Sequence, residues 1–404
     1  MSRIMVISEK PTAARKLAAA LDENGVPKEI KKKGASYFEC TKDNDEILVV
    51  YALGHLFELK QTEKGWTYPR LDMEWVPKYE VEKKATNIKP IISLIKGLAK
   101  DVDEFVVATD YDIEGSLIGY LTLRYACKVD PSRAKRMLFS TLTTKELQNS
   151  YNTANESLDF PMIDAGHVRH EVDWLYGINL TRALTLAIKK ASNWFKIVST
   201  GRVQGPVLAM VAERDRMINV YVPLPYWDIS TTSDYNGSEI SLEYSKGRIE
   251  ILKDAENIAD DLRGNTGKIE NIKRMQVSQS APVPFNLSGL QAEAYRHFGY
   301  KPSRTLALAQ ALYLEGIISY PRTSSQKIPP TIDVKQILTR LKERSQYKAH
   351  IAKILSAKNL TPMQGKATDP AHPAIHPTGS RLFVSRSFYP SLFPVARYNS
   401  WGWD

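Results

Sequence analysis

Short apolar runs alternate with helix-type segments through the first 150 residues, and this alternation restricts the fold more than any other feature. Strand-type runs are expected at 4–8, 47–52, 105–109 and 137–140. Helix-type patterns follow: one continues from the first strand through Leu21, two more cover 88–98 and 115–125, and another starts after Thr143. Strands alternating with helices form a mostly parallel sheet with helices on both faces. Ligands of such sheets bind beyond the carboxyl ends of the strands.

The rest of the chain changes character several times. The pattern predicts five parts: an α/β domain at 1–155, a helical segment at 156–220, a β-rich segment at 221–282, a helical segment at 283–379 and an atypical tail at 380–404. In the third part, strands are expected at 226–232, 240–244 and 248–252, and in the fourth, helices at 287–298 and 303–314. The fold class is therefore multidomain α/β plus α, with a small β-rich segment.

Composition excludes several classes of protein. Two cysteines are too few for a disulfide framework or a cysteine-rich zinc site. No apolar run reaches the roughly 18 residues of a membrane helix, and no leader of signal-peptide length precedes the first strand, so we expect a cytoplasmic protein without membrane contact. The net charge of +10 suits a polyanionic partner without requiring one. The absence of a GxxxxGK[ST] motif disfavours a P-loop motor.

Carboxylates gather where two predicted parallel strands end. Asp110, Asp112 and Glu114 follow one strand, and Glu9 and Lys10 follow the first strand. Clustered carboxylates repel one another, and Mg²⁺ relieves this repulsion with oxygen ligands. A carboxylic acid whose pKa is raised by acidic neighbours can donate a proton near neutral pH. The alternative interpretation is a solvated acidic loop beside a surface lysine.

A tyrosine follows a predicted helix in the stretch ISYPRTSS. Gly316 ends the helix, and Pro321 biases Tyr320 towards an extended conformation. Arg322, two residues on, can point the same way, compensate a phenolate and bind a phosphodiester. By itself, Tyr320 is equally compatible with an aromatic side chain packed at an element boundary.

Other polar groups suit phosphate contacts. Arg202 and Gln204 lie in a turn at an expected helix start, which is a common phosphate site. Arg169 and Asp173 are four apart on a helical face, the spacing of an ion pair. His372 lacks enough close histidine or cysteine neighbours for zinc, so a hydrogen bond to phosphate or a packing role fits it better.

Together these stretches resemble the type IA DNA topoisomerases of the archaeal type. The first part resembles their Toprim domain, and ISYPRTSS is similar to the motif of their catalytic tyrosine. GRVQ, AHPAIHPT and AGHVRHEVDWLYGINLTRAL match three further motifs, in the family's order, over residues 1–379. The family often has Glu where this chain has Ser116. The chain also resembles a member that lacks the C-terminal part, because members usually continue well past the HPT motif.

The resemblance implies an activity: cleavage of one DNA strand through a 5′-phosphotyrosyl bond, strand passage and rejoining, which relaxes negative supercoils without ATP. The resemblance implies that Tyr320 is the nucleophile, that Arg322 and Lys10 stabilise the charge on the phosphate, that Glu9 donates a proton and that His372 forms a hydrogen bond to the phosphate. It also implies a Mg²⁺ ion held by Asp110, Asp112, Glu114 and Glu9. The residues that it implies as DNA contacts are Arg169, Asp173, Arg202, Gln204, Thr323 and Ser324. The expected partner is single-stranded or negatively supercoiled DNA, at the nucleoid.

Two alternatives stay open. Another Toprim enzyme, a primase or a nuclease, would use the acidic residues and have no use for Tyr320. A truncated or split subunit would bind or cleave DNA without relaxing it, and a separate chain would supply the missing domains.

Overall fold

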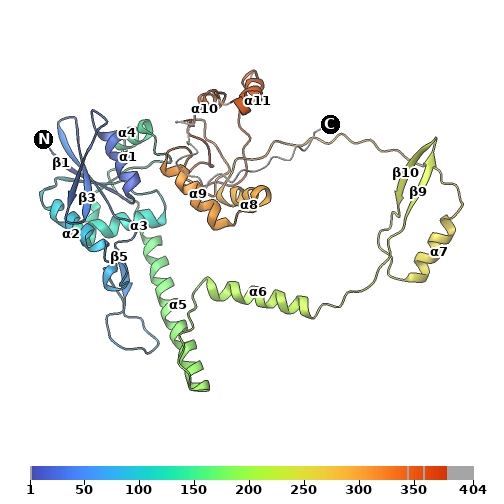
Figure 1. Ribbon diagram of the computed structural model, residues 1–404, viewed down its shortest axis with the longest axis horizontal. Helices are drawn as coiled ribbons and strands as arrows, with labels where there is room; N and C mark the ends of the chain where they lie inside the picture. The colour runs from blue at the N-terminus through green and yellow to red at the C-terminus, as the bar shows by residue number, and fades with distance from the viewer. Residues whose placement is uncertain (1, 344, 358–359, 380–404) are drawn as a thin grey trace. The chain divides into compact units, whose positions relative to one another are not determined.

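The computed structural model describes residues 2–343, 345–357 and 360–379, so the predicted tail at 380–404 lies outside the described residues. Two compact units divide the chain. One combines Met1–Gly201 with Ala281–Asp404, and the other is Arg202–Ser280. Figure 1 labels the elements of both units. The five-part division of the chain stays a prediction.

The first unit is built on a six-stranded sheet in the order β2-β3-β4-β1-β7-β8. Its strands are β1 (Arg3–Ser8), β2 (Lys28–Lys32), β3 (Ala35–Lys42), β4 (Asp45–Tyr51), β7 (Glu104–Val107) and β8 (Lys135–Arg136). From β4 to β8 neighbouring strands are parallel, which confirms the predicted sheet. β2, β3 and β4 pair antiparallel, and the sequence pattern did not reveal this half.

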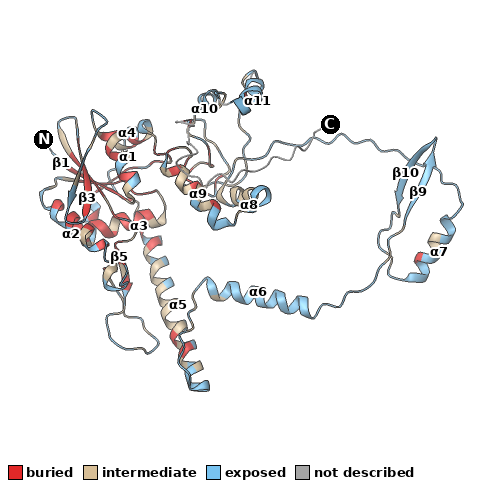
Figure 2. Cartoon of the chain, in the orientation of Figure 1, coloured by how far each residue is buried: buried red, intermediate tan, exposed pale blue. Residues whose placement is uncertain are grey.

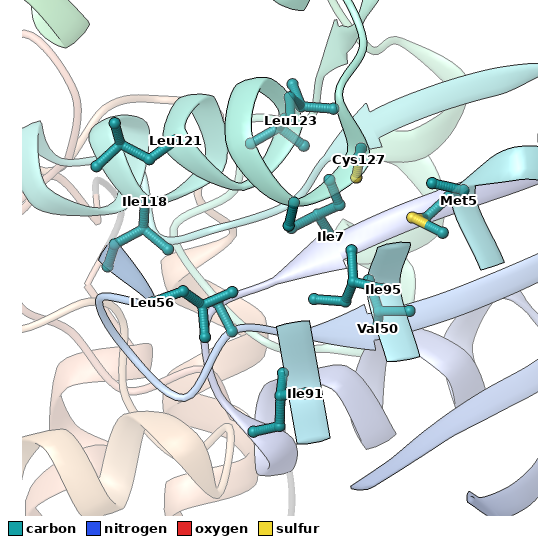
Figure 3. Close-up of a cluster of buried hydrophobic side chains, with 14 of the residues drawn as sticks. Met5, Ile7, Val50, Leu56, Ile91, Ile95, Ile118, Leu121, Leu123 and Cys127 are labelled. Carbon is teal, nitrogen blue, oxygen red and sulfur yellow. The ribbon is translucent and has the colours of Figure 1, made fainter. Parts of the chain in front are cut away.

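Helices cover both faces of this sheet, because successive strand residues point to opposite sides. Ile4 and Val6 of β1 face α1 (Pro11–Leu21) and α4 (Thr144–Asn152). Met5 and Ile7 face α2 (Ile88–Leu98), α3 (Ile113–Leu121) and the π-helix Thr122–Cys127. Figure 3 shows this second cluster, in which Met5, Ile7 and Val50 meet Ile91 and Ile95 of α2. The middle residues of β1 and β4 are apolar because both faces of these strands are buried there.

Three local details differ from what the sequence pattern alone suggests. No strand forms at 137–140, because pairing with β7 ends at Arg136. Thr143 precedes α4, but its side chain does not cap the helix; Glu146 instead accepts hydrogen bonds from the backbone of Ser140 and Thr141. The helix predicted at 303–314 forms and begins one residue earlier, at Pro302, after Lys301.

A long helix leaves the sheet domain beside the acidic loop. α5 (Phe160–Ser192) begins at Asp159, whose carboxylate accepts a hydrogen bond from the Met162 amide at 3.1 Å. α5 packs on α3, and Gly166 makes this possible: a Cβ there would lie 3.0 Å from Leu117 Cβ. The two helices therefore approach closely next to the residues that follow β7.

The remaining elements of the first unit are short. They are β5 (Phe57–Lys60) and β6 (Glu74–Pro77), which pair antiparallel, the single 3-10 turns Lys78–Glu80, Ala99–Asp101 and Pro131–Arg133, and the helices α8 (Leu287–Phe298), α9 (Pro302–Leu314), α10 (Val334–Leu341) and α11 (Ser345–Leu355). α9 ends before Gly316, which adopts a φ of +70°. Single β-bridges then join Ile318 to Pro377 and Phe285 to Ile375, so the segments around 320 and 375 lie side by side.

The second unit holds α6 (Gln204–Asn219), β9 (Ser230–Tyr235), β10 (Ser238–Glu243) and α7 (Leu252–Leu262). β9 and β10 form an antiparallel hairpin, and the third predicted strand is only a bridge between Trp227 and Ile249. These elements are largely exposed, as Figure 2 shows. Across the described parts of both units, no helix has the length and apolar composition needed to cross a bilayer.

Candidate active site

The acidic loop follows β7 and enters α3 through a tightly fixed turn. Asp112 is the N-cap of α3, and its Oδ1 accepts a hydrogen bond from the Gly115 amide at 2.7 Å. A Cβ on Gly115 would lie 2.1 Å from the backbone oxygen of Asp110, so only glycine fits there. Because the backbone folds back on itself in this way, the directions of Asp110 and Asp112 are set by the turn.

A buried arginine holds the backbone of the same loop through hydrogen bonds. The Arg136 guanidinium donates hydrogen bonds to the backbone oxygens of Thr109 at 2.8 Å and Asp110 at 2.9 Å. Burial lowers its pKa to about 10, against the opposing effect of Asp110, so the side chain stays charged near neutral pH. Sequence reasoning missed this residue, although a single arginine beside the apolar residues 137–139 was a usable signal.

Glu9 and Lys10 meet the loop as expected from adjacent parallel strands. Lys10 Nζ lies 2.9 Å from Glu9 Oε1 and 3.2 Å from Asp110 Oδ2. Burial raises the pKa of Glu9 to about 7, the Asp110 charge adds to the rise, and Lys10 opposes it. Burial disfavours the charged form of Lys10, but Asp110 and Glu9 outweigh it and raise the lysine pKa. Glu9 can therefore hold a proton near neutral pH, whereas Lys10 remains cationic.

Tyr320 reaches the acidic loop from the far end of the sequence. Its side chain is 2% exposed, and its phenol donates a hydrogen bond to Asp112 Oδ2 at 2.5 Å. Its backbone amide donates to the Ser140 oxygen at 2.8 Å. Burial raises the pKa of Tyr320, as do the charges of Asp110 and Asp112, while Arg322 opposes the rise. The phenol is thus protonated, and a carboxylate is in place to receive the proton.

A second tyrosine, Tyr313 of α9, was not predicted to belong to the site. Its phenol donates to Asp110 Oδ1 at 3.0 Å, and its ring stands edge-on to that of Tyr320, with centroids 5.1 Å apart. Burial, followed by the Asp110 charge, raises its pKa well above the ordinary value. Its place seven residues before Tyr320, on a helix face, was the available signal.

His372 lies against the same tyrosine. Its ring centroid is 4.7 Å from that of Tyr320, with Nδ1 2.9 Å from Ser140 Oγ and Nε2 3.0 Å from the Tyr111 oxygen. Nε2 must donate to this carbonyl, so Nδ1 is left to accept from Ser140. Burial lowers the pKa of His372, which keeps it neutral.

Two of the expected DNA contacts are used within the fold. Thr323 is buried, and its hydroxyl donates to the His372 oxygen at 3.2 Å, so it positions that histidine. Ser324 is exposed but bonds to Asp369 at 3.0 Å. Arg322 is exposed, so it remains available to a ligand. Arg202 and Gln204, both exposed, stand at the start of α6 in the second unit.

Glu114 turns towards two histidines that sequence reasoning also missed. Its Oε2 lies 2.9 Å from Nε2 of both His55 and His170, and Oε1 lies 3.1 Å from Arg169. The hydrogen bonds from His170 and His55 hold the pKa of Glu114 well below its usual range. Asp173 lies one turn along α5 from Arg169.

Comparison with known proteins identifies the family. The DNA topoisomerase family matches residues 157–386, and the Toprim domain matches residues 4–142. DNA topoisomerase 1 of Pyrococcus horikoshii is 43% identical over 378 residues, which are 93% of this chain and 55% of that protein. DNA topoisomerase 1 of Methanocaldococcus jannaschii is 41% identical over 376 residues, which are 92% of this chain and 48% of that protein. The chain thus spans about half the length of these relatives.

The fold agrees with a solved structure as well. The full-length topoisomerase I of Thermotoga maritima superposes with a TM-score of 0.61 at 20% sequence identity, covering 93% of this chain and 55% of that one. The matches cover both the sheet that carries the acidic loop and the segment that carries Tyr320. The chain therefore belongs to the type IA DNA topoisomerase family.

Proposed function

We propose that this chain cleaves and rejoins one strand of DNA through a covalent bond between Tyr320 and a 5′ phosphate. The observation that supports this most is the hydrogen bond between the Tyr320 phenol and Asp112, which joins residues 208 positions apart in the sequence. A Toprim nuclease or primase would need the acidic loop but not this tyrosine. The contact therefore favours a reaction in which the phenol takes part.

The proposed step is a displacement at phosphorus. The Tyr320 oxygen attacks, the bond from phosphorus to O3′ breaks, and the phenol proton passes to the Asp112 carboxylate. Glu9, with a pKa of about 7, donates its proton to O3′, which leaves as a 3′-hydroxyl. Rejoining is the reverse attack by this hydroxyl. The phosphotyrosyl bond retains the energy of the broken bond, so the cycle needs no ATP.

Cationic side chains support the charge on the phosphate. Lys10 is held beside Glu9 and Asp110, and Arg322 is exposed two residues after the nucleophile. Charge-assisted hydrogen bonds from such groups are stronger than neutral ones and gain most where charge develops. We assign His372 a supporting hydrogen bond through its Nε2, which would have to leave the Tyr111 oxygen.

The acidic residues fit a Mg²⁺ ion. Hard oxygen ligands suit this ion, and the Asp110 charge, which adds to the effect of burial in raising the pKa of Glu9, supports a site where negative charge gathers. We propose that Asp110 and Asp112 hold Mg²⁺, with Glu9 close by; Glu114, predicted as a further ligand, is turned towards the histidines. The bound ion would supply positive charge near the phosphate.

We propose single-stranded or negatively supercoiled DNA as the substrate and relaxation of negative supercoils as the outcome in the whole protein. Arg169, Asp173, Arg202 and Gln204 stay in the proposal as DNA contacts. Because the relatives are about twice as long, a separate chain could supply domains for strand passage. Action on chromosomal DNA implies a cytoplasmic, nucleoid-associated protein.

The test is to trap the covalent adduct on end-labelled single-stranded DNA. The wild-type chain should form it, and Tyr320→Phe should abolish it, because no hydroxyl remains to attack. Tyr347→Phe, on exposed α11, is the matched control and should leave the yield unchanged. An adduct that survives in Tyr320→Phe would refute the assignment, and cleavage without any adduct would indicate a Toprim nuclease.

A relaxation assay then separates the whole reaction from its first half. Adduct formation together with relaxation would support the complete cycle in this chain. Adduct formation without relaxation would identify a subunit that needs a partner, and DNA binding without an adduct would contradict the enzymatic proposal.

A further inference from the structure

Two histidines and a glutamate converge beside the acidic loop. His55 precedes β5, Glu114 lies in the first turn of α3, and His170 lies on α5. Each offers one ligand atom, and the three atoms lie within 4.8 Å of one another. Among the described residues, Glu9, Asp110 and Asp112 do not form a group this tight.

We propose that His55, Glu114 and His170 form a separate site for a divalent ion of the zinc and cobalt class. Imidazole nitrogens suit Zn²⁺ and Co²⁺, whereas Mg²⁺ prefers oxygen ligands. Two histidines and one glutamate are also a known zinc set, which leaves a fourth position for water. The donor chemistry therefore distinguishes this site from the Mg²⁺ site proposed at Asp110 and Asp112.

Two of the three distances between ligand atoms are already close to those of a zinc site. Both Nε2 atoms lie 2.9 Å from the same carboxylate oxygen, Glu114 Oε2. Ligands about 2.0 Å from a tetrahedral zinc are roughly 3.3 Å apart, so each of these two nitrogen–oxygen pairs must open by about 0.4 Å. The three ligand atoms, which now lie within 4.8 Å of one another, must also close around the ion. A third hydrogen-bonding residue fixes the carboxylate: Arg169 binds Oε1 at 3.1 Å and leaves Oε2 facing the histidines.

The surroundings hold all three ligands in place. The His55 and His170 rings are 4.8 Å apart, and Trp75 of β6 packs against His170 with centroids 5.8 Å apart. Gly166 lets α5 approach α3 closely enough for His170 to reach Glu114. An ion here would join the segment before β5, α3 and α5, so its binding should stabilise the fold. The Arg169 charge opposes the ion and limits its affinity.

The experiment uses the full chain, stripped of metal with a chelator and titrated with Co²⁺ in the absence of DNA. We expect one equivalent to bind with the intense visible absorption of tetrahedral Co²⁺ and to raise the melting temperature. His55→Ala and His170→Ala should each weaken binding by more than roughly 100-fold, because loss of a ligand costs more than the 10–100-fold lost with an outer partner.

His167→Ala is the matched control, since His167 lies on the same helix and packs against Trp75 and Tyr120 without joining the cluster. It should bind Co²⁺ like the wild-type chain. His55→Gln and His170→Gln, checked for folding by circular dichroism, serve if the alanine variants unfold, and they should lose the tetrahedral spectrum.

Three results would overturn the site. One is a wild-type chain that shows no tetrahedral Co²⁺ spectrum, and another is an equal loss of binding in His167→Ala and His55→Ala. The third is a spectrum that vanishes in the double variant Asp110→Asn, Asp112→Asn yet persists in the histidine variants. Because the Co²⁺ titration contains no DNA, a negative result would leave the cleavage proposal untouched, and the adduct assay tests that proposal separately.

Discussion

The six-stranded sheet of the first unit and the β9–β10 hairpin of the second differ most in what covers them. In the six-stranded sheet of the first unit, β1 and β4 are almost fully buried between helices. In the second unit, every residue of the β9–β10 hairpin is exposed, and Ala255 is the one buried residue among those described between 202 and 280. A two-stranded hairpin alone is marginally stable in water.

This difference in burial indicates which residues the fold holds in fixed positions. Asp110, Asp112 and Glu9 follow strands whose side chains are locked on both faces, so their backbone cannot relax without disturbing a core. Nothing comparable fixes α6 or the hairpin within the described part of the second unit. Substitutions in the two units should therefore have very different costs.

The largest difference is expected between two arginines. Arg136→Ala should lower the free energy of unfolding of the first unit by about 3–5 kcal/mol, because it leaves buried backbone oxygens and Asp110 uncompensated. Arg248→Ala, which removes a guanidinium 4.1 Å from the Tyr226 ring, should cost less than about 1 kcal/mol. Urea unfolding followed by circular dichroism measures both. Equal losses would break the comparison.

Two leucines give the next contrast. Leu48 of β4 is fully buried, so Leu48→Ala should cost roughly 2–5 kcal/mol through lost burial and a cavity. Leu208 of α6 is 67% exposed, so Leu208→Ala should change stability by no more than about 0.5 kcal/mol. The same unfolding measurement applies. A Leu208→Ala loss above 2 kcal/mol would show that α6 packs as tightly as β4.

The smallest expected effect concerns the protonation of Glu9. Glu9 must be protonated to act as the acid, and its pKa is raised to about 7, so adduct formation should fall roughly tenfold per pH unit above that value. Glu9→Gln should slow cleavage and remove this decline. Glu239→Gln, in the exposed β10, should leave the profile unchanged. A wild-type profile that is flat from pH 6 to about 9 would contradict the role of Glu9.

Prediction from sequence worked where periodicity and strand order act together. The alternation placed Glu9 beside Asp110, because neighbouring parallel strands bring their ends together. It failed for β2, because the charged edge strand KEIKK has no apolar periodicity to detect, and it also missed β3. It also placed a strand at 137–140, because an apolar run does not reveal where ladder pairing stops.

The candidate site was predictable where residues share a motif, and not where they come together only by packing. Tyr320 and Arg322 belong to one short stretch, and the spacing suggested a role for both. His55 and His170 are 115 positions apart, and their meeting depends on α5 crossing α3 at Gly166. Thr323 was expected to contact DNA, and this remains a prediction; its burial could not be read from its sequence neighbours.

The hydrogen bonds of Tyr320 and Tyr313 to the two aspartates have a consequence for substrate affinity. In the proposed reaction, DNA entering between the phenols and the carboxylates would compete with these internal contacts, so its apparent dissociation constant would combine intrinsic binding with the equilibrium between engaged and released tyrosines. On that proposal, any change that weakens the engaged state would tighten DNA binding. The contact between the Tyr320 phenol and Asp112 would then act as a competitive ligand built into the protein.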